Sequence, residues 1–225
     1  MVAVPQPGPV PVALVRHGQT DWNLARRVQG HTDVPLNDVG RSEAAEAGRL
    51  LGGGGWQRVV TSTLSRAAET GTIIAQALAL PEPPAVAALM ERDYGEAEGF
   101  TVDDYRALQR EPEGMEPWEA VVERSAGALR ELVREDRRPL VAVAHGGVLR
   151  ALLLAASAGA VPEHGVPILN GAIAGIGVDP DAEGHGIVFL RAPSHEPYSV
   201  PQALSELQGA ERNASTSSAA SRGRS

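Results

Sequence analysis

The stretch LVRHGQT (residues 14–20) decides how the rest of the chain is interpreted. It completes an apolar run of strand type, residues 10–15, and places Arg16 and His17 side by side where that strand ends, just before Gly18. Loops at strand ends leave side chains free for chemistry. The sequence therefore predicts that this junction belongs to a functional site.

Length and composition limit the fold and the partners. A chain of 225 residues with 43% hydrophobic content can bury a substantial core, so we expect one main domain. The net charge of -8 argues against a nucleic-acid or anionic-membrane binder, because those functions need a broad basic field. The chain has no cysteine, and all 20 basic residues are arginines. Disulfides, thiol nucleophiles, Schiff-base lysines and P-loop lysines are therefore excluded.

The two ends of the chain differ in composition from the middle. Residues 1–11 are rich in proline and lack the basic region and apolar core of a signal peptide. No segment approaches the roughly 20 apolar residues of a membrane span. We therefore expect a soluble, cytoplasmic protein with no membrane partner. Residues 201–225 contain few large apolar side chains and are predicted to form a disordered tail, which leaves residues 12–200 as the domain.

Strand-like and helix-like segments alternate through this domain, which predicts an α/β fold with a mainly parallel sheet between helices. Asn37 has the character of a helix N-cap, and apolar residues recur at helical spacing through 118–133 and 146–156. The expected strands are residues 10–15, 58–61, 86–89, 140–144, 168–178 and 186–190.

Polar residues with catalytic potential follow four of these strands. Arg16 and His17 follow the first, Arg66 follows the second, and Glu91 and His145 come after the third and fourth. In open α/β sheets, ligands bind in the crevice at the carboxyl ends of the strands. We therefore expect these side chains to form one cluster.

Five stretches of the chain, in the same order, resemble the histidine phosphatase superfamily, which contains cofactor-dependent phosphoglycerate mutases and many phosphatases. The resemblance extends from residue 12 to residue 190 and implies a three-layer α/β/α sandwich with a mainly parallel mixed sheet. The matching stretches are LVRHGQTDWN (14–23), QGHTDVPLNDVG (29–40), TSTLSRAAET (61–70), LMERDYGEAEG (89–99) and VAHGG (143–147).

The resemblance implies that His17 is the nucleophile and that Arg16 and Arg66 hold the phosphoryl group. A neutral imidazole can attack phosphorus and leave a phosphohistidine for water to hydrolyse. Nearby arginines should favour this neutral form. A guanidinium group donates two parallel hydrogen bonds to phosphoryl oxygens and stays charged throughout the reaction.

Other residues are assigned by position within the matched stretches. His145 corresponds to a second histidine that contacts the phosphoryl group, and Gly146 opens a helix whose amides can approach an anion. Asn23 is assigned as a further substrate contact. By the same register, Glu91 supplies the proton to the leaving oxygen, with three rivals in its loop: Asp93, Glu96 and Glu98.

Two features favour the phosphatase branch over the mutases. The segment between Glu91 and His145 is short, whereas mutases carry a longer insertion there. Residues 93–105 contain five acids and no base, although a mutase must hold a second anionic group. Ala97, however, stands where many phosphatases carry an aromatic residue.

The sequence thus predicts a phosphomonoesterase that needs no metal or cofactor and hydrolyses a small phosphorylated metabolite. The alternatives are a 2,3-bisphosphoglycerate-dependent phosphoglycerate mutase and a phosphate-binding or scaffolding module without turnover. The other histidines share no metal-ligand spacing, and we expect loop or surface positions for them, with His31 near the pocket; they are His31, His164, His185 and His195. The substrate and the oligomeric state, monomer or dimer, stay open.

Overall fold

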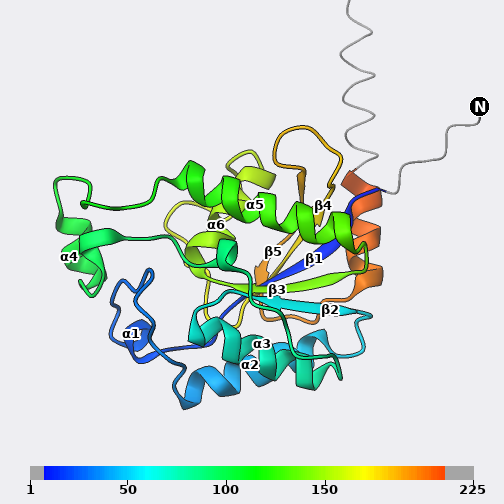
Figure 1. Cartoon of the computed structure of the whole chain (residues 1–225), viewed down its shortest axis with the longest axis horizontal. Coiled ribbons are helices and arrows are strands. Elements are labelled where there is room, and N and C mark those ends of the chain that lie inside the picture. The colour runs from blue at the N-terminus through cyan, green and yellow to red at the C-terminus, as the bar shows by residue number, and fades with distance from the viewer. Residues whose placement is uncertain (1–7, 211–225) are drawn as a thin grey trace, which may run out of the picture.

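The structure, a computed structural model, describes residues 8–210 (Figure 1). Its elements, in chain order, are β1 (Val10–Arg16), α1 (Asp21–Leu24), α2 (Asp38–Leu51), β2 (Arg58–Thr61), α3 (Ser65–Ala77), the 3-10 helices η1 (Ala87–Leu89) and η2 (Gly95–Ala97), α4 (Val102–Ala107), α5 (Trp118–Glu135), β3 (Leu140–Ala144), α6 (Gly146–Ala156), β4 (Ile173–Val178) and β5 (Ile187–Ser194). Residues 200–210 are also helical.

The five strands form one mixed sheet in the order β2-β3-β1-β4-β5. Strands β2, β3 and β1 are parallel, whereas β4 is antiparallel to β1 and β5 is antiparallel to β4. Four strands therefore run in one direction, and the prediction of a mainly parallel mixed sheet is confirmed. Strands β1 and β3 lie inside the sheet and are covered on both faces, which explains why they are almost continuously apolar.

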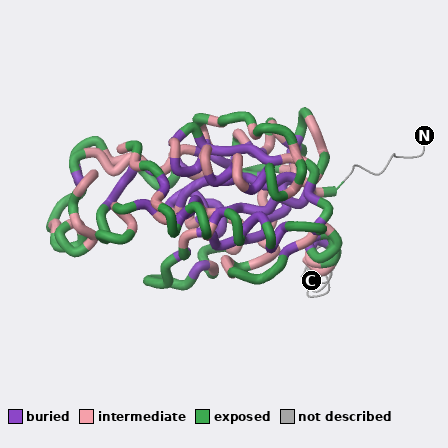
Figure 2. The backbone as a smooth tube through the Cα atoms, turned by 90° about the horizontal axis from the view of Figure 1, so that it is seen from below, coloured by how far each residue is buried: buried purple, intermediate pink, exposed green. Residues whose placement is uncertain are grey.

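Helices cover both faces of the sheet, as Figure 1 shows. Val12 and Leu14 of β1 point into a core shared with α5 and α6, and Ala13 and Val15 point into a second core shared with α2 and α3. Figure 2 shows the resulting pattern of a buried central layer with exposed outer segments. The three-layer α/β/α prediction is confirmed.

The strand predicted at residues 86–89 is wrong. Only an isolated bridge forms, between Thr61 of β2 and Ala85, and the chain then turns into η1. Pro83 and Pro84 have no N–H to donate to a ladder. The Arg124 guanidinium of α5 instead binds the carbonyl oxygens of Ala88, Met90 and Glu91 at 2.8, 2.8 and 3.0 Å. A side chain thus replaces the missing strand partner.

The domain boundaries also differ from those predicted. Strand β1 begins at Val10, inside the expected N-terminal extension. The expected disordered tail is wrong for residues 201–210, which are helical, because Ala203 and Leu207 lie four residues apart on one face and are both buried. Residues 1–7 and 211–225, where the rest of these two predictions falls, lie outside the described residues. Strands β4 and β5 begin later than expected, and β5 extends to Ser194.

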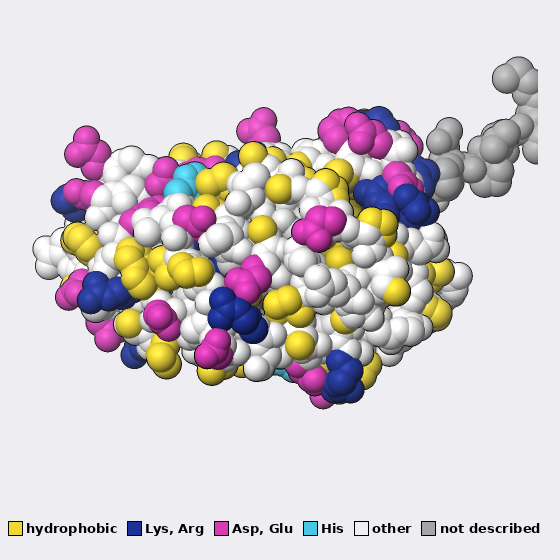
Figure 3. Space-filling model, turned by 60° about the horizontal axis from the view of Figure 1, so that its bottom comes forward, with side chains coloured by type: hydrophobic (Ala, Val, Ile, Leu, Met, Phe, Trp, Pro, Cys, Tyr) yellow, Lys and Arg dark blue, Asp and Glu magenta, His cyan; other side chains and the backbone are white. Residues whose placement is uncertain are grey.

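The surface carries basic and acidic groups side by side. On the face seen in Figure 3, arginines lie scattered beside acidic side chains and form no broad basic area. On α2, Arg41 pairs with Glu69 and Arg49 pairs with Glu46. Among residues 8–210, no helix has the length and apolar character needed to cross a bilayer. The cytoplasmic location stays a prediction.

Candidate active site

The carboxyl ends of β1 and β3 bring two histidines together. His17 follows Arg16, the last residue of β1, and its backbone N–H donates to the carbonyl of Ala144 at 3.0 Å. His145 directly follows β3 and is the N-cap residue of α6. The two imidazole ring centroids lie 5.1 Å apart. Parallel pairing of β1 with β3 therefore creates the centre of the predicted cluster.

His17 is held as a neutral imidazole. Its Nδ1 lies 2.7 Å from the carbonyl oxygen of Gly18. Because a carbonyl only accepts hydrogen bonds, Nδ1 must carry the proton and Nε2 is left with a free lone pair. Burial lowers the pKa of His17 well below its usual value, and the charges of Arg16 and Arg66 lower it further. The imidazole is therefore uncharged at neutral pH.

Gly18 has to be glycine because the backbone of α2 passes directly beside it. A Cβ at this position would lie 2.2 Å from the carbonyl oxygen of Gly40, and no side chain can move to relieve that contact. The Gly18 N–H donates to Thr70 Oγ1 of α3 at 3.1 Å. Packing against α2 and α3 therefore fixes the turn that carries His17.

Two arginines lie beside His17, Arg66 fully buried and Arg16 partly buried. Arg16 donates from Nη1 to the carbonyl of Ile168 at 2.5 Å, and Arg66, which is fully buried, donates to the carbonyls of Gly30 and Thr32 at 2.8 and 3.0 Å. Burial lowers the pKa of both guanidinium groups, although such groups remain protonated. The Nε atoms of both arginines are buried without a hydrogen-bond partner in the described part of the chain. Both groups keep donor capacity for an anion.

His145 is fully buried, and Ser62, at the end of β2, holds its ring. Nε2 of His145 lies 2.8 Å from Ser62 Oγ, and Nδ1 has no partner among the described residues. Burial, followed by the neighbouring His17 and Arg66, lowers the pKa of His145 well below its usual value. The sequence interpretation missed Ser62, although its place at the end of a strand was the signal that drew attention to His17.

Glu91 reaches the same centre from the loop after η1. Its carboxylate accepts hydrogen bonds from the backbone N–H of Gly147 at 3.0 Å and of Arg92 at 2.9 Å. A Cβ on Gly147 would lie 2.4 Å from Glu91 Oε1. The second glycine of the HGG motif therefore allows the carboxylate to approach the N-terminus of α6.

The three rival acids make other contacts. Glu98 accepts from the N–H groups of His31 and Thr32 at 2.6 and 2.8 Å and from the Thr32 hydroxyl at 2.5 Å, so it clamps the loop that holds Arg66. Exposed Glu96 pairs with Arg110. Asp93 accepts from the N–H of Gly95 and lies 3.6 Å from the His31 ring. Of the four acids, Glu91 is the one that binds the N-terminus of α6 and lines the same cavity as His17.

Asn23 is held with its amide group available. Its Oδ1 accepts from Thr20 and from the side chain of Asn170, whose Nδ2 also donates to the His17 carbonyl at 2.9 Å. The oxygen is thus fully engaged, and the NH2 group of Asn23 remains as a donor toward a ligand.

A cavity of about 810 Å³ opens over this cluster. Its lining includes all but one of the predicted site residues, namely Arg16, His17, Asn23, Arg66, Glu91 and Gly146. His145 does not line the cavity; it is fully buried, with its ring beside that of His17. His164 is an exposed loop residue, as predicted, and it also lines the cavity, whereas the ring of His31 bonds the Glu91 carbonyl outside the cavity.

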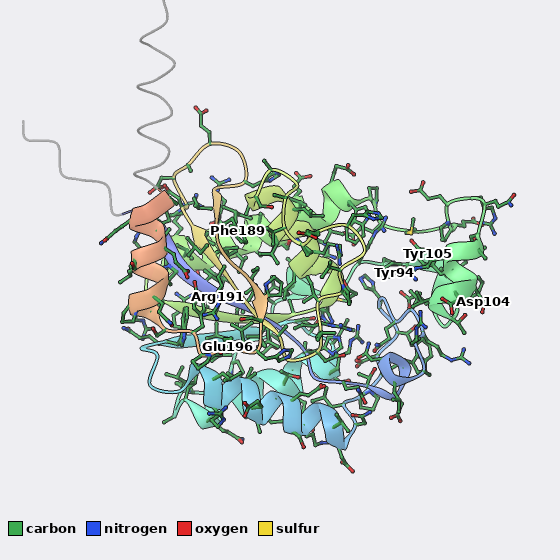
Figure 4. The ribbon with its side chains drawn as sticks, turned by 180° about the vertical axis from the view of Figure 1, so that it is seen from behind. Tyr94, Asp104, Tyr105, Phe189, Arg191 and Glu196 are labelled. Carbon is green, nitrogen blue, oxygen red and sulfur yellow. The ribbon has the colours of Figure 1, made fainter. Side chains whose placement is uncertain are left out.

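Aromatic side chains form part of the cavity wall. Tyr94 and Tyr105 meet edge to face with ring centroids 5.9 Å apart, and both line the cavity together with Trp118. Figure 4 shows the two tyrosines beside α4, with Asp104 on its outer side. Burial and the neighbouring Glu91 raise the pKa of Tyr94, so its phenol stays neutral. Ala97 is buried away from the cavity, and these rings supply the aromatic wall in its place.

Residues 93–105 contain no base, but the cavity is also lined by three arginines from outside that segment, Arg27, Arg106 and Arg150. These positions could not be read from the sequence, because the fold alone brings them to one cavity. Among the residues that the structure describes, no three His, Asp or Glu side chains gather as a metal site would require.

The fold and the cluster together define an enzyme that handles phosphoryl groups. A family model for the histidine phosphatase superfamily (branch 1) matches residues 12–183. An uncharacterized phosphatase, PhoE, of Bacillus subtilis (strain 168) is 36% identical over 170 residues, which cover 73% of this chain and 86% of that protein. The chain belongs to the histidine phosphatase superfamily, branch 1.

Other relatives include both mutases and phosphatases. A 2,3-bisphosphoglycerate-dependent phosphoglycerate mutase of Methylobacterium sp. (strain 4-46) is 38% identical over 164 residues, which cover 64% of this chain and 78% of that protein. The mycobacterial glucosyl-3-phosphoglycerate phosphatase, solved with VO3, superposes with a TM-score of 0.69 at 27% identity, covering 80% of this chain and 96% of that one. YhfR of Bacillus stearothermophilus gives a TM-score of 0.70 at 27% identity, with coverages of 82% and 98%.

Proposed function

We propose that this enzyme is a metal-independent phosphomonoesterase that hydrolyses a small phosphorylated metabolite through a phosphohistidine at His17. One observation carries the proposal. Three buried nitrogen atoms that have no hydrogen-bond partner among the described residues, Nε of Arg16, Nε of Arg66 and Nδ1 of His145, all belong to side chains close to His17, whose own Nδ1 is engaged by the Gly18 carbonyl. Buried polar groups are almost always hydrogen-bonded, so a bound phosphoryl group is the natural partner for all three.

In the first step, Nε2 of His17 attacks phosphorus. A P–N bond forms while the P–O bond to the ester breaks, and the leaving oxygen takes a proton from the carboxyl group of Glu91. Arg16 and Arg66 stabilise the charge spread over the three equatorial oxygens. His145 contributes a further hydrogen bond if Nδ1 carries its proton, which requires the Ser62 hydroxyl to donate to Nε2.

In the second step, water attacks the phosphohistidine. The Glu91 carboxylate, deprotonated by the first step, takes a proton from that water as the new P–O bond forms. The P–N bond breaks, inorganic phosphate leaves, and His17 returns to its neutral form. The positive charge that phosphoryl transfer needs comes from the arginines, which is why we propose turnover without a metal ion.

A single-turnover experiment with 32P-labelled phenyl phosphate tests this mechanism. We expect label on the protein that is stable in base and lost in acid, no label on His17→Ala, and unchanged turnover after treatment with EDTA. Glu91→Gln should slow alkyl phosphates more than 4-nitrophenyl phosphate, whose leaving group needs no proton. Normal turnover by His17→Ala, or activity that depends on added divalent metal, would contradict the proposal.

The mutase stays the second candidate because three additional arginines line the cavity, and some relatives carry that name. Incubation with 3-phosphoglycerate and 2,3-bisphosphoglycerate separates the two activities. A phosphatase releases inorganic phosphate in proportion to substrate consumed, whereas a mutase forms 2-phosphoglycerate with little net release. A scaffolding module would do neither and would give no phosphohistidine.

A further inference from the structure

The cavity is strongly cationic although the protein is acidic. The chain carries a net charge of -8, yet the cavity lining contains five arginines and a single carboxylate, that of Glu91. Arg16 and Arg66 lie at the phosphoryl end. Arg27, Arg106 and Arg150, which the proposed reaction does not use, complete the set.

None of these three outer arginines makes an ion pair among the described residues. The Arg27 side chain donates to the carbonyl of Gly99 at 2.7 Å, and the Arg150 side chain donates to the carbonyl of Val166. The Arg106 side chain makes no hydrogen bond within the described part of the chain. By contrast Arg26, the neighbour of Arg27, lies 3.3 Å from the carboxylate of Asp103. A cation without a carboxylate partner keeps its full attraction for an anionic ligand.

The positions of these arginines suit recognition of a second group on one substrate. Arg150 is half-buried on α6, one helical turn after Gly146. The helix therefore holds Arg150 at a fixed distance from the phosphoryl end of the cavity. Arg106 comes from α4 and Arg27 from the loop after α1. A cavity of about 810 Å³ leaves room for a substrate much larger than phosphate.

We infer that Arg27, Arg106 and Arg150 form a second anion subsite, and that the preferred substrate is a phosphomonoester with another oxyanion at its far end. This inference rests on the proposed phosphatase function. A carboxylate and a second phosphoryl group share the chemistry that guanidinium groups recognise, two oxygens in one plane. The tyrosine and tryptophan rings of the wall would contact the carbon frame between the two anions.

Three aryl esters test the subsite: phenyl phosphate, 4-carboxyphenyl phosphate and 1,4-phenylene bisphosphate. We expect kcat/KM for at least one anionic ester to exceed that for phenyl phosphate by about tenfold or more at low salt. This ratio should fall as ionic strength rises. The ester that is preferred shows whether the second group is a carboxylate or a phosphoryl group. A preference of 3-phosphoglycerate over glycerol 3-phosphate would extend the result to a shorter frame.

Substitutions in the cavity test whether these arginines cause the preference for the anionic esters. Arg106→Gln and Arg150→Gln should each bring the ratio of kcat/KM values toward one. Arg49→Gln removes an exposed arginine of α2 outside the cavity and should leave both the ratio and the rates as in the wild type. A wild-type ratio of one for every anionic ester, or ratios that survive both cavity substitutions, would overturn the inference.

Binding of phosphonates keeps the inference separate from the proposed function. If phenyl phosphate is not hydrolysed at all, the phosphatase proposal fails. The subsite is still judged by calorimetric titration of the full-length protein with benzylphosphonate and 4-carboxybenzylphosphonate. Tighter binding of the carboxylated compound, lost in Arg150→Gln and kept in Arg49→Gln, supports the subsite. Equal affinities overturn it.

Discussion

Replacing Glu98 by alanine should damage the phosphate site from a distance. The Glu98 carboxylate accepts three short hydrogen bonds from His31 and Thr32, and the same loop offers its Gly30 and Thr32 carbonyls to Arg66. The clamp therefore fixes the carbonyl acceptors that orient the Arg66 guanidinium, which we propose binds the phosphoryl group. Without it, the loop loses the carboxylate that binds its backbone N–H groups and the Thr32 hydroxyl.

The size of the effect follows from these contacts. A hydrogen bond to a charged group contributes about 1.5–3 kcal/mol. The donors are partly exposed and recover water when the carboxylate is removed, so we expect roughly 2–3 kcal/mol for the whole clamp rather than the sum. For a chain of this size, each 1 kcal/mol lowers Tm by about 2–4 °C, which gives a loss of roughly 4–12 °C. A displacement of Arg66 by about 1 Å would lower kcat/KM by about 100-fold.

Thermal unfolding and phenyl phosphate kinetics of three variants, Glu98→Ala, Glu98→Gln and Glu96→Ala, provide the measurement. Glu96→Ala is the matched control, because Glu96 lies two residues away in the same loop and forms an exposed pair with Arg110 that should contribute little. Glu98→Gln keeps one acceptor oxygen and should recover part of both losses. Wild-type Tm and kcat/KM in Glu98→Ala would refute the clamp. A normal Tm with a loss confined to poor leaving groups would instead make Glu98 the acid.

Three further results are expected. Ser62→Ala should lower kcat about 10-fold or more and change the 15N shifts of the His145 ring nitrogens, since the partner of Nε2 is lost; Ser62→Thr should restore part of the rate, and an unchanged 15N spectrum would contradict this role. The lowered pKa values of His17 and His145 mean that the unfolded chain binds more protons below about pH 6.5. The free energy of unfolding should therefore fall as pH decreases through that range, and urea titrations at pH 7.5 and 5.5 would detect it, whereas equal values would argue against buried neutral histidines. Gly147→Ala places a methyl group 2.4 Å from the Glu91 carboxylate and should slow alkyl phosphates more than 4-nitrophenyl phosphate, a difference that equal losses would disprove.

Local sequence predicted the centre of the fold and of the candidate site. Strands β1 and β3 are apolar on both faces because both are inside the sheet, so each reads clearly as a buried strand. Arg16, His17 and His145 follow directly from their ends. The glycines beside them indicated close approaches, and the structure gives the reason. At Gly18 a backbone carbonyl, and at Gly147 a carboxylate, passes too close for a side chain.

Features that depend on distant side chains could not be predicted in this way. We expected Glu91 to be positioned by a strand at residues 86–89. Instead, Arg124 of α5 holds this segment by binding three of its carbonyl oxygens. The C-terminal helix was missed because residues 201–210 look polar, and only packing shows that Ala203 and Leu207 find a buried place. In the sequence, Arg150 is only a polar residue on an otherwise apolar helix. Its position in the cavity depends on the packing of α6 beside the loop at residues 162–168, which lines the same cavity.

The way the arginines are held explains how an acidic protein keeps a cationic cavity. Exposed arginines such as Arg49 and Arg138 pair with carboxylates, which cancels their charge locally. In the cavity, backbone carbonyls orient four guanidinium groups, those of Arg16, Arg27, Arg66 and Arg150. The nearest carboxylate to Arg66, that of Asp33, is 4.0 Å away and already accepts hydrogen bonds from Ser65.

A carbonyl dipole fixes the direction of a guanidinium group without neutralising it, whereas a carboxylate does both. The cavity arginines are therefore preorganised and still available to an anion, which is the arrangement that stabilises transferring phosphoryl charge most effectively. Glu91 is the exception, because it is the one acid among the described residues that line the cavity. Two backbone N–H groups hold its carboxylate close to the arginines, which suits the proton exchange with the substrate that we propose for it.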